Sequence, residues 1–362
     1  PDGGRALYVA TLDPATMKQG IARIDLRTRA AAVLREGPIS TRGGALGVDA
    51  HGGALAYVAE DVGHPTEVWL TDALLRRARR VTNLNPGSAG YAPGESRLVE
   101  WLGADGRALR GALLLPADYR PTRRYPLVVL VYGGEAGSES LNVFGLGGSS
   151  AENMQLLATR GYAVLYPDTP LRVGHALDDL ESAVLPGVNR VIELGVADPG
   201  RLAIMGHSYG GYSTLGLITR TRRFKAAVSS AGPSDLFATW GRLTKNGGLA
   251  GDVVERGQGG MAGTPWTQRD RYLRNSPFFE LDRVTTPVLV VQGELDVTVP
   301  AAESDRVFAA LKRLGVEAQY VRYGGEGHAL AGYANLCDYW TRVIAWFDRH
   351  LEPRERRSAA ID

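Results

Sequence analysis

The chain has 362 residues, which is longer than one average domain, so two domains are expected. Hydrophobic residues make up 44% and charged residues 22%, which is typical of a soluble globular protein with a substantial core. The formal net charge of +2 argues against a nucleic-acid-binding protein and against binding to an anionic membrane surface.

The cysteine count and the hydropathy pattern argue against three further classes of protein: disulfide-bonded, metal-binding and membrane-spanning proteins. A single cysteine, Cys337, cannot form a disulfide within the chain, and we expect it to be a buried small side chain. The sequence has neither a CxxC pair nor an HExxH motif, so we expect no metal and no cofactor. No apolar run approaches the roughly 18 residues of a membrane span, and no leader-like segment follows Pro1. We therefore expect a soluble chain without a membrane partner, with the cytoplasm slightly favoured over the periplasm or secretion.

Residues 1–94 contain short β-type runs that are separated by turn residues such as Gly, Pro and Asn. The predicted strands cover residues 6–10, 20–26, 31–34, 54–60, 66–71 and 79–82. Two blocks of similar design, residues 1–40 and 41–90, each match one four-stranded propeller blade. Because two blades cannot close a ring, we predict the last part of a longer propeller or a small open β domain. A free-standing sandwich-like cap is the alternative.

From residue 95 onward the pattern changes to alternating strands and helices, after a hairpin with strands at 98–102 and 109–115. The later predicted strands are 127–131, 163–166, 201–205, 226–229, 288–292 and 317–323. The predicted helices are 151–160, 177–194, 209–220, 301–314 and 333–351. Continuous apolar strands between helices predict an α/β fold with a mostly parallel, doubly wound sheet. We assign residues 95–352 to this catalytic domain and 353–362 to a disordered tail.

The sequence Gly206-His-Ser208-Tyr-Gly210 follows one of these strands and opens a helix. This context is typical of a nucleophile elbow, in which a Cβ at either glycine would collide with the neighbouring strand or helix. The positive end of the helix and the amide of Tyr209 would stabilise negative charge beside the serine. We therefore predict Ser208 as a nucleophile and the Tyr209 N–H as an oxyanion donor.

A serine hydroxyl needs a base to take its proton, and His328 is the best-placed histidine. It ends the glycine-rich stretch 324–328, directly after the predicted strand 317–323. His175, in an irregular stretch, is the remaining alternative. The other histidines lie beside the serine, in the β-rich segment or in the last helical turn: His207, His51, His64 and His350.

An orienting carboxylate is expected after a strand that lies between these two positions in the chain. Asp296 follows the predicted strand 288–292, with Glu294 in the same turn as its nearest rival and Asp235 as another. The order serine, aspartate, histidine is that of α/β-hydrolases.

A second oxyanion donor is expected after the strand 127–131. Tyr132 stands there, followed by Gly133 and Gly134, whose missing side chains would let a substrate approach the backbone. The alternative is an aromatic side chain that closes the end of the strand.

These motifs together resemble the prolyl oligopeptidase family of serine peptidases, which join a β-propeller to a C-terminal α/β-hydrolase domain. The resemblance extends over residues 101–116, 125–126, 131–134, 206–211, 275–277, 293–300 and 325–328. It implies a triad of Ser208, Asp296 and His328, with Tyr132 helping to hold the oxyanion. Residues 64–69 together with residues 82–86 look like a last blade of bacterial members similar to glutamyl endopeptidases and acylaminoacyl peptidases. A missing upstream propeller segment is therefore expected.

The sequence departs from the family near the substrate. Glu135 stands where members often have proline, and residues 169–174 replace a frequent Arg-Gly-Ser sequence. Specificity therefore stays open. If the substrate is acidic, Arg172 is the candidate counter-charge, together with a cluster of further basic residues. These are Arg242, Lys245 and Arg256.

The function that follows is a serine peptidase that cleaves short peptides through an acyl-enzyme intermediate. A carboxylesterase acting on small esters with the same triad is the alternative. A third alternative is an inactive hydrolase fold that binds partners through the glycine-rich loop 257–263 and the N-terminal β segment. The sequence gives no oligomeric state.

Overall fold

The computed structural model describes residues 5–41, 44–49, 53–147 and 152–351, so the predicted tail at 353–362 lies outside the described residues. The chain forms two compact units. The N-terminal unit comprises Pro1–Leu98, Ala112–Tyr119 and Ser138–Gly161, and the C-terminal unit comprises Val99–Gly111, Arg120–Gly137 and Tyr162–Asp362.

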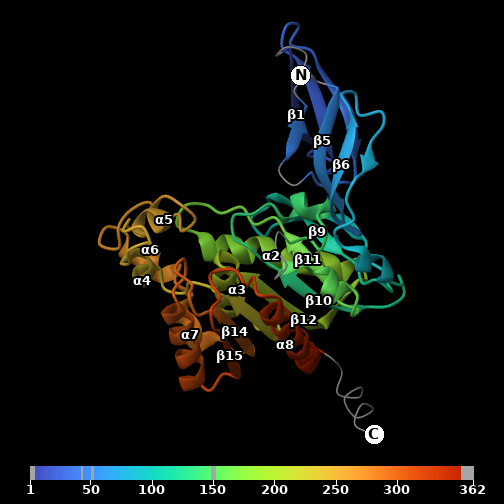
Figure 1. The fold of residues 1–362 in the computed structure, drawn as a ribbon. Coiled ribbons are helices and arrows are strands. Elements are labelled where there is room, and N and C mark those ends of the chain that lie inside the picture. Colours follow the sequence, from blue (N-terminus) through green and yellow to red (C-terminus); the bar gives the residue numbers. More distant parts are fainter. Residues whose placement is uncertain (1–4, 42–43, 50–52, 148–151, 352–362) are drawn as a thin grey trace. The chain divides into compact units, whose positions relative to one another are not determined.

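The N-terminal unit contains two small antiparallel sheets (Figure 1). The first has the strand order β1 (Ala6–Leu12), β2 (Gln19–Asp25), β3 (Ala31–Gly37). The second has the order β4 (Leu46–Val48), β5 (Ala54–Asp61), β6 (His64–Asp72), β7 (Arg79–Arg80). Alternate side chains of β5 are buried and pack with residues from both sheets in one core. That these sheets are propeller blades stays a prediction.

The other sheet has eight strands in the order β15-β14-β13-β12-β10-β11-β9-β8. Its strands are β8 (Ser96–Leu102), β9 (Ala108–Leu114), β10 (Tyr125–Leu130), β11 (Ala163–Pro167), β12 (Ala197–His207), β13 (Ala226–Ser230), β14 (Val288–Gly293) and β15 (Ala318–Tyr323). The strands from β10 to β15 pair in parallel, and β14 is buried along its whole length. Burial on both faces explains why these strands read as continuous apolar runs.

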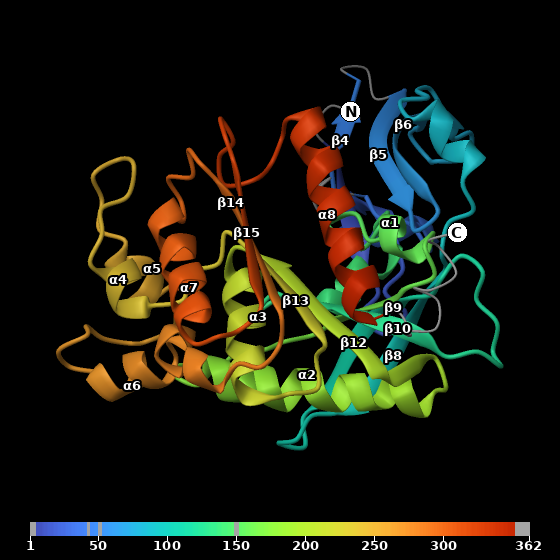
Figure 2. The same cartoon turned by 90° about the horizontal axis from the view of Figure 1, so that it is seen from below.

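Four long helices cover this sheet: α2 (Ala176–Glu193), α3 (Tyr209–Arg220), α7 (Ala301–Arg313) and α8 (Tyr333–Leu351). Figure 2 shows α8 on one face of the sheet and α3 and α7 on the other. The buried side of α8 includes Trp340, Val343 and Phe347. The expectation of a buried Cys337 is wrong, because this residue lies on the exposed side of α8.

Pro186 lies inside α2, where it removes a backbone N–H from the helix. The Ser182 carbonyl, four residues earlier, instead accepts a hydrogen bond from the Ala104 N–H at 2.9 Å. The neighbouring Ala183 carbonyl accepts the indole N–H of Trp101, also at 2.9 Å. The turn between β8 and β9 is therefore fixed to the helix at the position that the proline leaves open.

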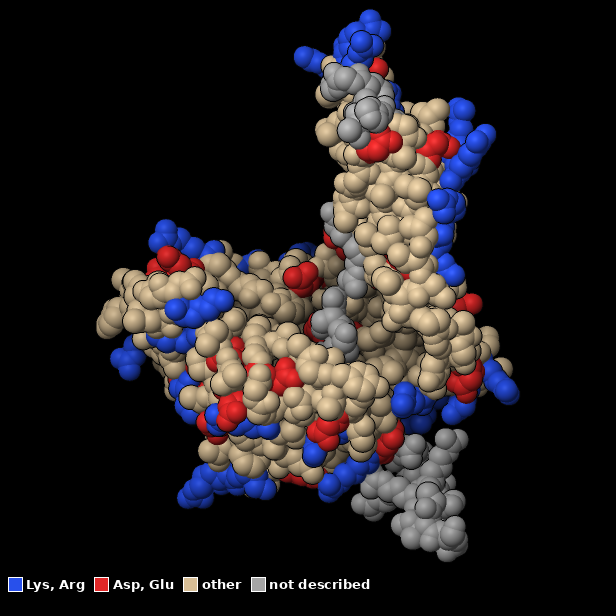
Figure 3. Space-filling model, viewed as in Figure 1, with Lys and Arg blue, Asp and Glu red and all other residues tan. Residues whose placement is uncertain are grey.

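Several short elements have no counterpart in the sequence prediction. They are η1 (Pro86–Gly90), η2 (Gly137–Asn142), α4 (Leu236–Trp240), α5 (Gly251–Glu255), α6 (Arg269–Arg274) and η4 (Pro277–Arg283), while the predicted helix 151–160 is reduced to α1 (Gln155–Ala158). Within the described ranges, no helix combines the length and hydropathy needed to cross a bilayer. Basic and acidic side chains are interspersed over the face shown in Figure 3.

Candidate active site

Ser208 occupies the sharp turn between β12 and α3. Its backbone has φ 59° and ψ −121°, a conformation that costs a non-glycine residue free energy and is found preferentially at functional sites. The Ser208 N–H donates to the Ser230 carbonyl at 2.8 Å, which ties the turn to β13. A Cβ at Gly206 would lie 2.4 Å from the Gly210 oxygen, and one at Gly210 would lie 2.4 Å from the Val131 oxygen. The turn therefore requires both glycines.

A continuous chain of hydrogen bonds starts at this serine. His328 Nε2 lies 2.8 Å from Ser208 Oγ, and His328 Nδ1 lies 2.8 Å from Asp296 Oδ2. Because an ionised carboxylate only accepts, Nδ1 carries the imidazole proton and Nε2 is left to accept from the serine. This arrangement can move a proton from the hydroxyl to the imidazole.

Asp296 is buried, and its carboxylate is fully engaged. Oδ1 accepts the backbone N–H groups of Thr298 and Val299, each at 2.8 Å, while Oδ2 accepts Gln292 Nε2 at 3.0 Å in addition to His328. Burial is the largest single influence and acts to raise the pKa of Asp296, but the bonds from His328 and the two amides together outweigh it and lower the pKa. The carboxylate is therefore ionised where it can orient an imidazole.

Glu326 holds the loop that carries His328, a role that the sequence analysis missed. Its buried carboxylate accepts Asn335 Nδ2 at 2.6 Å and the N–H groups of Ala331 and Gly332 at 2.9 Å. Its own carbonyl accepts the Leu295 N–H at 2.8 Å. The histidine loop and the aspartate loop are therefore joined next to the site.

His207, the residue before the serine, also contacts the histidine loop. Its Nε2 donates to the His328 carbonyl at 2.6 Å, and the two imidazole rings lie 4.6 Å apart between centroids. His207 therefore holds the backbone of His328 from the elbow side.

The rival residues have other roles in the structure. Glu294 is exposed to solvent. Asp235 caps α4 by accepting the Phe237 N–H at 2.9 Å, and its other oxygen lies 3.3 Å from Arg306. His175 stands at the start of α2, 3.6 Å from Asp178.

The two predicted oxyanion residues, Tyr132 and Tyr209, have neighbouring aromatic rings. The Tyr209 N–H belongs to the first turn of α3, where backbone donors have no partner within the helix. The rings of Tyr132 and Tyr209 are 6.2 Å apart between centroids, and the Tyr132 hydroxyl accepts Gln258 Nε2 at 2.9 Å. Gly133 is fixed by a hydrogen bond of its N–H to Ser213 Oγ at 3.0 Å.

A cavity of about 370 Å³ opens beside Ser208 and Tyr209. Its walls are largely apolar, with contributions from α4, α5 and the turn after Asp296. The lining includes Leu236, Val254, Val299, Arg242 and Lys245. The Arg242 guanidinium donates to the Thr298 carbonyl, which holds it against this wall.

Arg172 lines a different cavity, together with Gly133, Gly134 and the loop that contains Gln258. Its guanidinium pairs with the fully buried carboxylate of Asp179 at 2.6 Å, and this ion pair raises the pKa of Arg172. Arg172 therefore already compensates a buried charge, and its contact with a substrate stays a prediction. Arg256 pairs with Asp252 at 2.8 Å.

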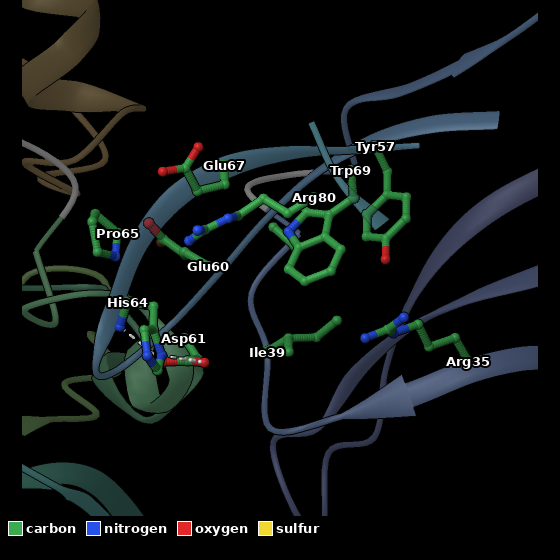
Figure 4. A pocket seen from close by; sticks show the side chains of 11 residues that line it. Arg35, Ile39, Tyr57, Glu60, Asp61, His64, Pro65, Glu67, Trp69 and Arg80 are labelled. Atoms are coloured by element: carbon green, nitrogen blue, oxygen red, sulfur yellow. Dashed lines mark hydrogen bonds and ion pairs between the residues drawn. The ribbon is translucent and has the colours of Figure 1, made fainter. Parts of the chain in front are cut away.

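The N-terminal unit has a cavity of its own, of about 310 Å³ (Figure 4). At one end the guanidinium of Arg35 lies 6.0 Å from the Tyr57 ring and 5.8 Å from the Trp69 ring. At the other end lie Glu60 and Glu67. Glu67 accepts the Thr82 hydroxyl and the Leu84 N–H, and Glu60 accepts the Thr66 hydroxyl at 2.5 Å.

Among the residues that the structure describes, no three His, Cys, Asp or Glu side chains come together in a way that could hold a metal ion.

Comparison with known proteins identifies the family. Residues 182–354, which include Ser208, Asp296 and His328, match the prolyl oligopeptidase family. The chain carries a prolyl oligopeptidase family domain. This confirms the family to which the sequence motifs point.

The curated relatives that the chain matches include proteins named as peptidases. The uncharacterized peptidase YuxL of Bacillus subtilis is 27% identical over 70% of this chain and 39% of its own length. Dipeptidyl aminopeptidase BIII of Pseudoxanthomonas mexicana is 31% identical over 64% of this chain and 35% of its own length. The chain thus spans less than half the length of these relatives.

Solved structures confirm the α/β-hydrolase fold. The acylaminoacyl peptidase of Pyrococcus horikoshii superposes with a TM-score of 0.75 at 22% identity, over 96% of this chain and 54% of that one. A puromycin-hydrolyzing peptidase of Mycobacterium tuberculosis superposes with a TM-score of 0.73, also at 22% identity, over 95% of this chain and 54% of that one.

Proposed function

We propose that this chain hydrolyses peptide bonds as a serine peptidase, with Ser208 as nucleophile, His328 as general base and Asp296 as orienting acid. The observation that supports this most is the hydrogen-bond chain from a serine on a strained elbow through an imidazole to a buried carboxylate. Membership of the prolyl oligopeptidase family and the names of the curated relatives favour a peptide as the substrate.

The proposed reaction has two acyl-transfer steps. Ser208 Oγ attacks the peptide carbonyl carbon while His328 Nε2 takes the hydroxyl proton, and Asp296 stabilises the imidazolium that forms. The Tyr209 N–H and the Tyr132 hydroxyl donate to the oxyanion of the tetrahedral intermediate. When the intermediate collapses, the C–N bond breaks and His328 returns the proton to the leaving amine. A water molecule, deprotonated by His328, then attacks the acyl-enzyme. The bond between Ser208 Oγ and the acyl carbon breaks, His328 returns the proton to Ser208, and the acid is released.

We further propose that the cavity beside Ser208 takes the substrate side chain next to the scissile bond. Leu236, Val254 and Val299 suit an apolar stem, while Arg242 and Lys245 suit an acidic end. A glutamate side chain combines both features. Turnover of matched peptides with Glu, Gln or Leu at this position tests the idea, since Arg242→Ala should reduce the preference for Glu, and an unchanged preference would remove Arg242 from this role.

The activity itself is tested with short peptides and p-nitrophenyl esters, using the wild-type chain and Ser208→Ala. We expect peptide cleavage that Ser208→Ala abolishes. Ester turnover without any peptide cleavage would instead indicate a carboxylesterase. A folded wild-type chain that turns over neither kind of substrate would contradict the proposal.

A further inference from the structure

The glycine-rich loop after α5 is held in place by backbone hydrogen bonds. The N–H groups of Gly259, Met261 and Ala262 donate to carbonyls of Val253, Val254 and Glu255 at 3.0, 2.9 and 2.8 Å. This loop therefore folds back onto α5 and presents Gln258 at a defined position.

Gln258 reaches Tyr132, which is 126 positions away in the chain. Its Nε2 donates to the Tyr132 hydroxyl oxygen at 2.9 Å. Because the amide N–H is the donor, the phenolic oxygen accepts, and the phenolic hydrogen stays available for a different acceptor. Gln258 also lines both the cavity that holds Ser208 and the cavity that holds Gly133 and Gly134.

We propose that Gln258 is a positioning residue that directs the Tyr132 hydroxyl hydrogen toward the oxyanion formed at Ser208. The inference rests on the proposed function, because it requires an acyl-transfer intermediate. A hydrogen bond accepted by a hydroxyl group polarises its O–H bond and makes it a better donor. Gln258 thus both orients the donor and strengthens it, without touching the reacting atoms.

An isosteric change separates this role from simple support of the loop. In Gln258→Glu, the ionised carboxylate can only accept, so the Tyr132 hydroxyl would donate to it and turn its hydrogen away from the oxyanion. We expect kcat to fall about 10²- to 10³-fold, as on removal of an oxyanion donor, with little change in KM. Gln258→Leu removes the bond without reversing it, so its loss should be smaller.

A double-mutant cycle with Tyr132→Phe tests whether Gln258 acts through Tyr132. Once the hydroxyl is gone, Gln258→Glu and Gln258→Leu should each lower kcat no further. Losses that persist in the Tyr132→Phe background would overturn the proposal, because they would come from added charge or from the loop. Full activity of Gln258→Glu would overturn it as well.

Two controls complete the experiment. Gln319→Glu makes the same chemical change at an exposed position of β15 and should leave kcat unchanged. Labelling of the wild-type chain at Ser208 by a fluorophosphonate distinguishes a failure of the proposed Gln258 role from a failure of the proposed function. If Ser208 is labelled but the cycle is additive, only the role of Gln258 fails, and if the folded wild type is not labelled, the proposed function fails.

Discussion

The two units of this protein each contain a cavity and buried carboxylates, and the carboxylates are used differently. In the N-terminal cavity, Glu67 of β6 accepts hydrogen bonds from the Thr82 hydroxyl and the Leu84 N–H. These bonds only fix residues 82–84 to β6. In the C-terminal unit, Asp296 passes its interaction through His328 to the hydroxyl of Ser208.

The comparison shows that buried charge beside a cavity does not by itself indicate chemistry. Glu67 and Glu326 are alike in burial and in fixing a loop, yet of the two only Glu326 holds a segment that carries the proposed base, His328. The distinguishing feature is a chain of bonds that ends at a reactive group on a strained residue.

Removal of the base should have the largest effect. For His328→Ala we expect a fall in kcat of about 10⁶-fold, because no group would take the Ser208 proton. Steady-state hydrolysis of a peptide substrate measures this fall. A loss of less than ten-fold in a folded variant would place the base elsewhere.

Asp296→Asn should come next, with a fall in kcat of about 10⁴-fold. An asparagine has one oxygen that accepts and an NH₂ group that only donates, whereas Asp296 accepts hydrogen bonds on both oxygens. Its NH₂ group must therefore face a donor, and the tautomer of His328 is no longer fixed. The same assay measures the loss, and circular dichroism verifies folding. Glu294→Gln is the matched control and should retain activity.

Glu326→Gln should have a smaller effect on catalysis and a clear effect on stability. Displacement of the His328 loop can lower kcat by up to about 10²-fold. Replacing a carboxylate that accepts three donors should lower the free energy of unfolding by about 1–3 kcal/mol. Urea denaturation measures this difference.

The difference in unfolding free energy between wild type and Glu326→Gln should depend on pH, because the pKa of Glu326 is lowered in the folded state. Hydrogen bonds from Asn335 and Ala331 favour the ionised form of Glu326 and lower its pKa in the folded state. Its contribution to stability is therefore complete above the ordinary glutamate range and is lost as the pH falls through the folded-state pKa. We expect a wide gap between wild type and Glu326→Gln at pH 7 that narrows below about pH 4. A constant gap would contradict the role of the charge.

Glu67→Gln is the matched change in the N-terminal unit and should have the smallest effect on catalysis. It replaces a buried carboxylate that also fixes a segment, so a similar loss of stability is expected. The rate of fluorophosphonate labelling should stay within about two-fold of wild type, since no bond of Glu67 leads to the nucleophile. A fall in the labelling rate as large as that caused by Glu326→Gln would remove the distinction between Glu67 and Glu326.

Much of the fold could be predicted, because long amphipathic helices and buried parallel strands have strong local patterns. The elbow is likewise local, since Gly206, Ser208 and Gly210 act within one turn. The short helices α4, α5 and α6 were missed because five or six residues show no periodicity. The expectation that Cys337 is buried was wrong, because an amphipathic α-helix leaves one side exposed to solvent, and Cys337 lies on that side of α8.

The site was only partly predictable, for a physical reason. The sequence alone provided little reason to prefer Asp296 over Glu294 as the orienting acid, because both lie in the same turn. In the structure Glu294 is exposed, whereas Asp296 is buried and accepts four hydrogen bonds. Glu326 and Gln258 act through contacts that depend on how loops meet in space. A glycine-rich stretch around each polar residue is the one signal that the sequence offered.

The central claim is that Ser208 is the nucleophile, and intact-mass and peptide-mapping analysis after reaction with a fluorophosphonate tests it most directly. The account predicts one adduct per wild-type chain, located on Ser208, and none on folded Ser208→Ala. An adduct at full stoichiometry on Ser208→Ala, or a wild-type adduct at another residue, would contradict it.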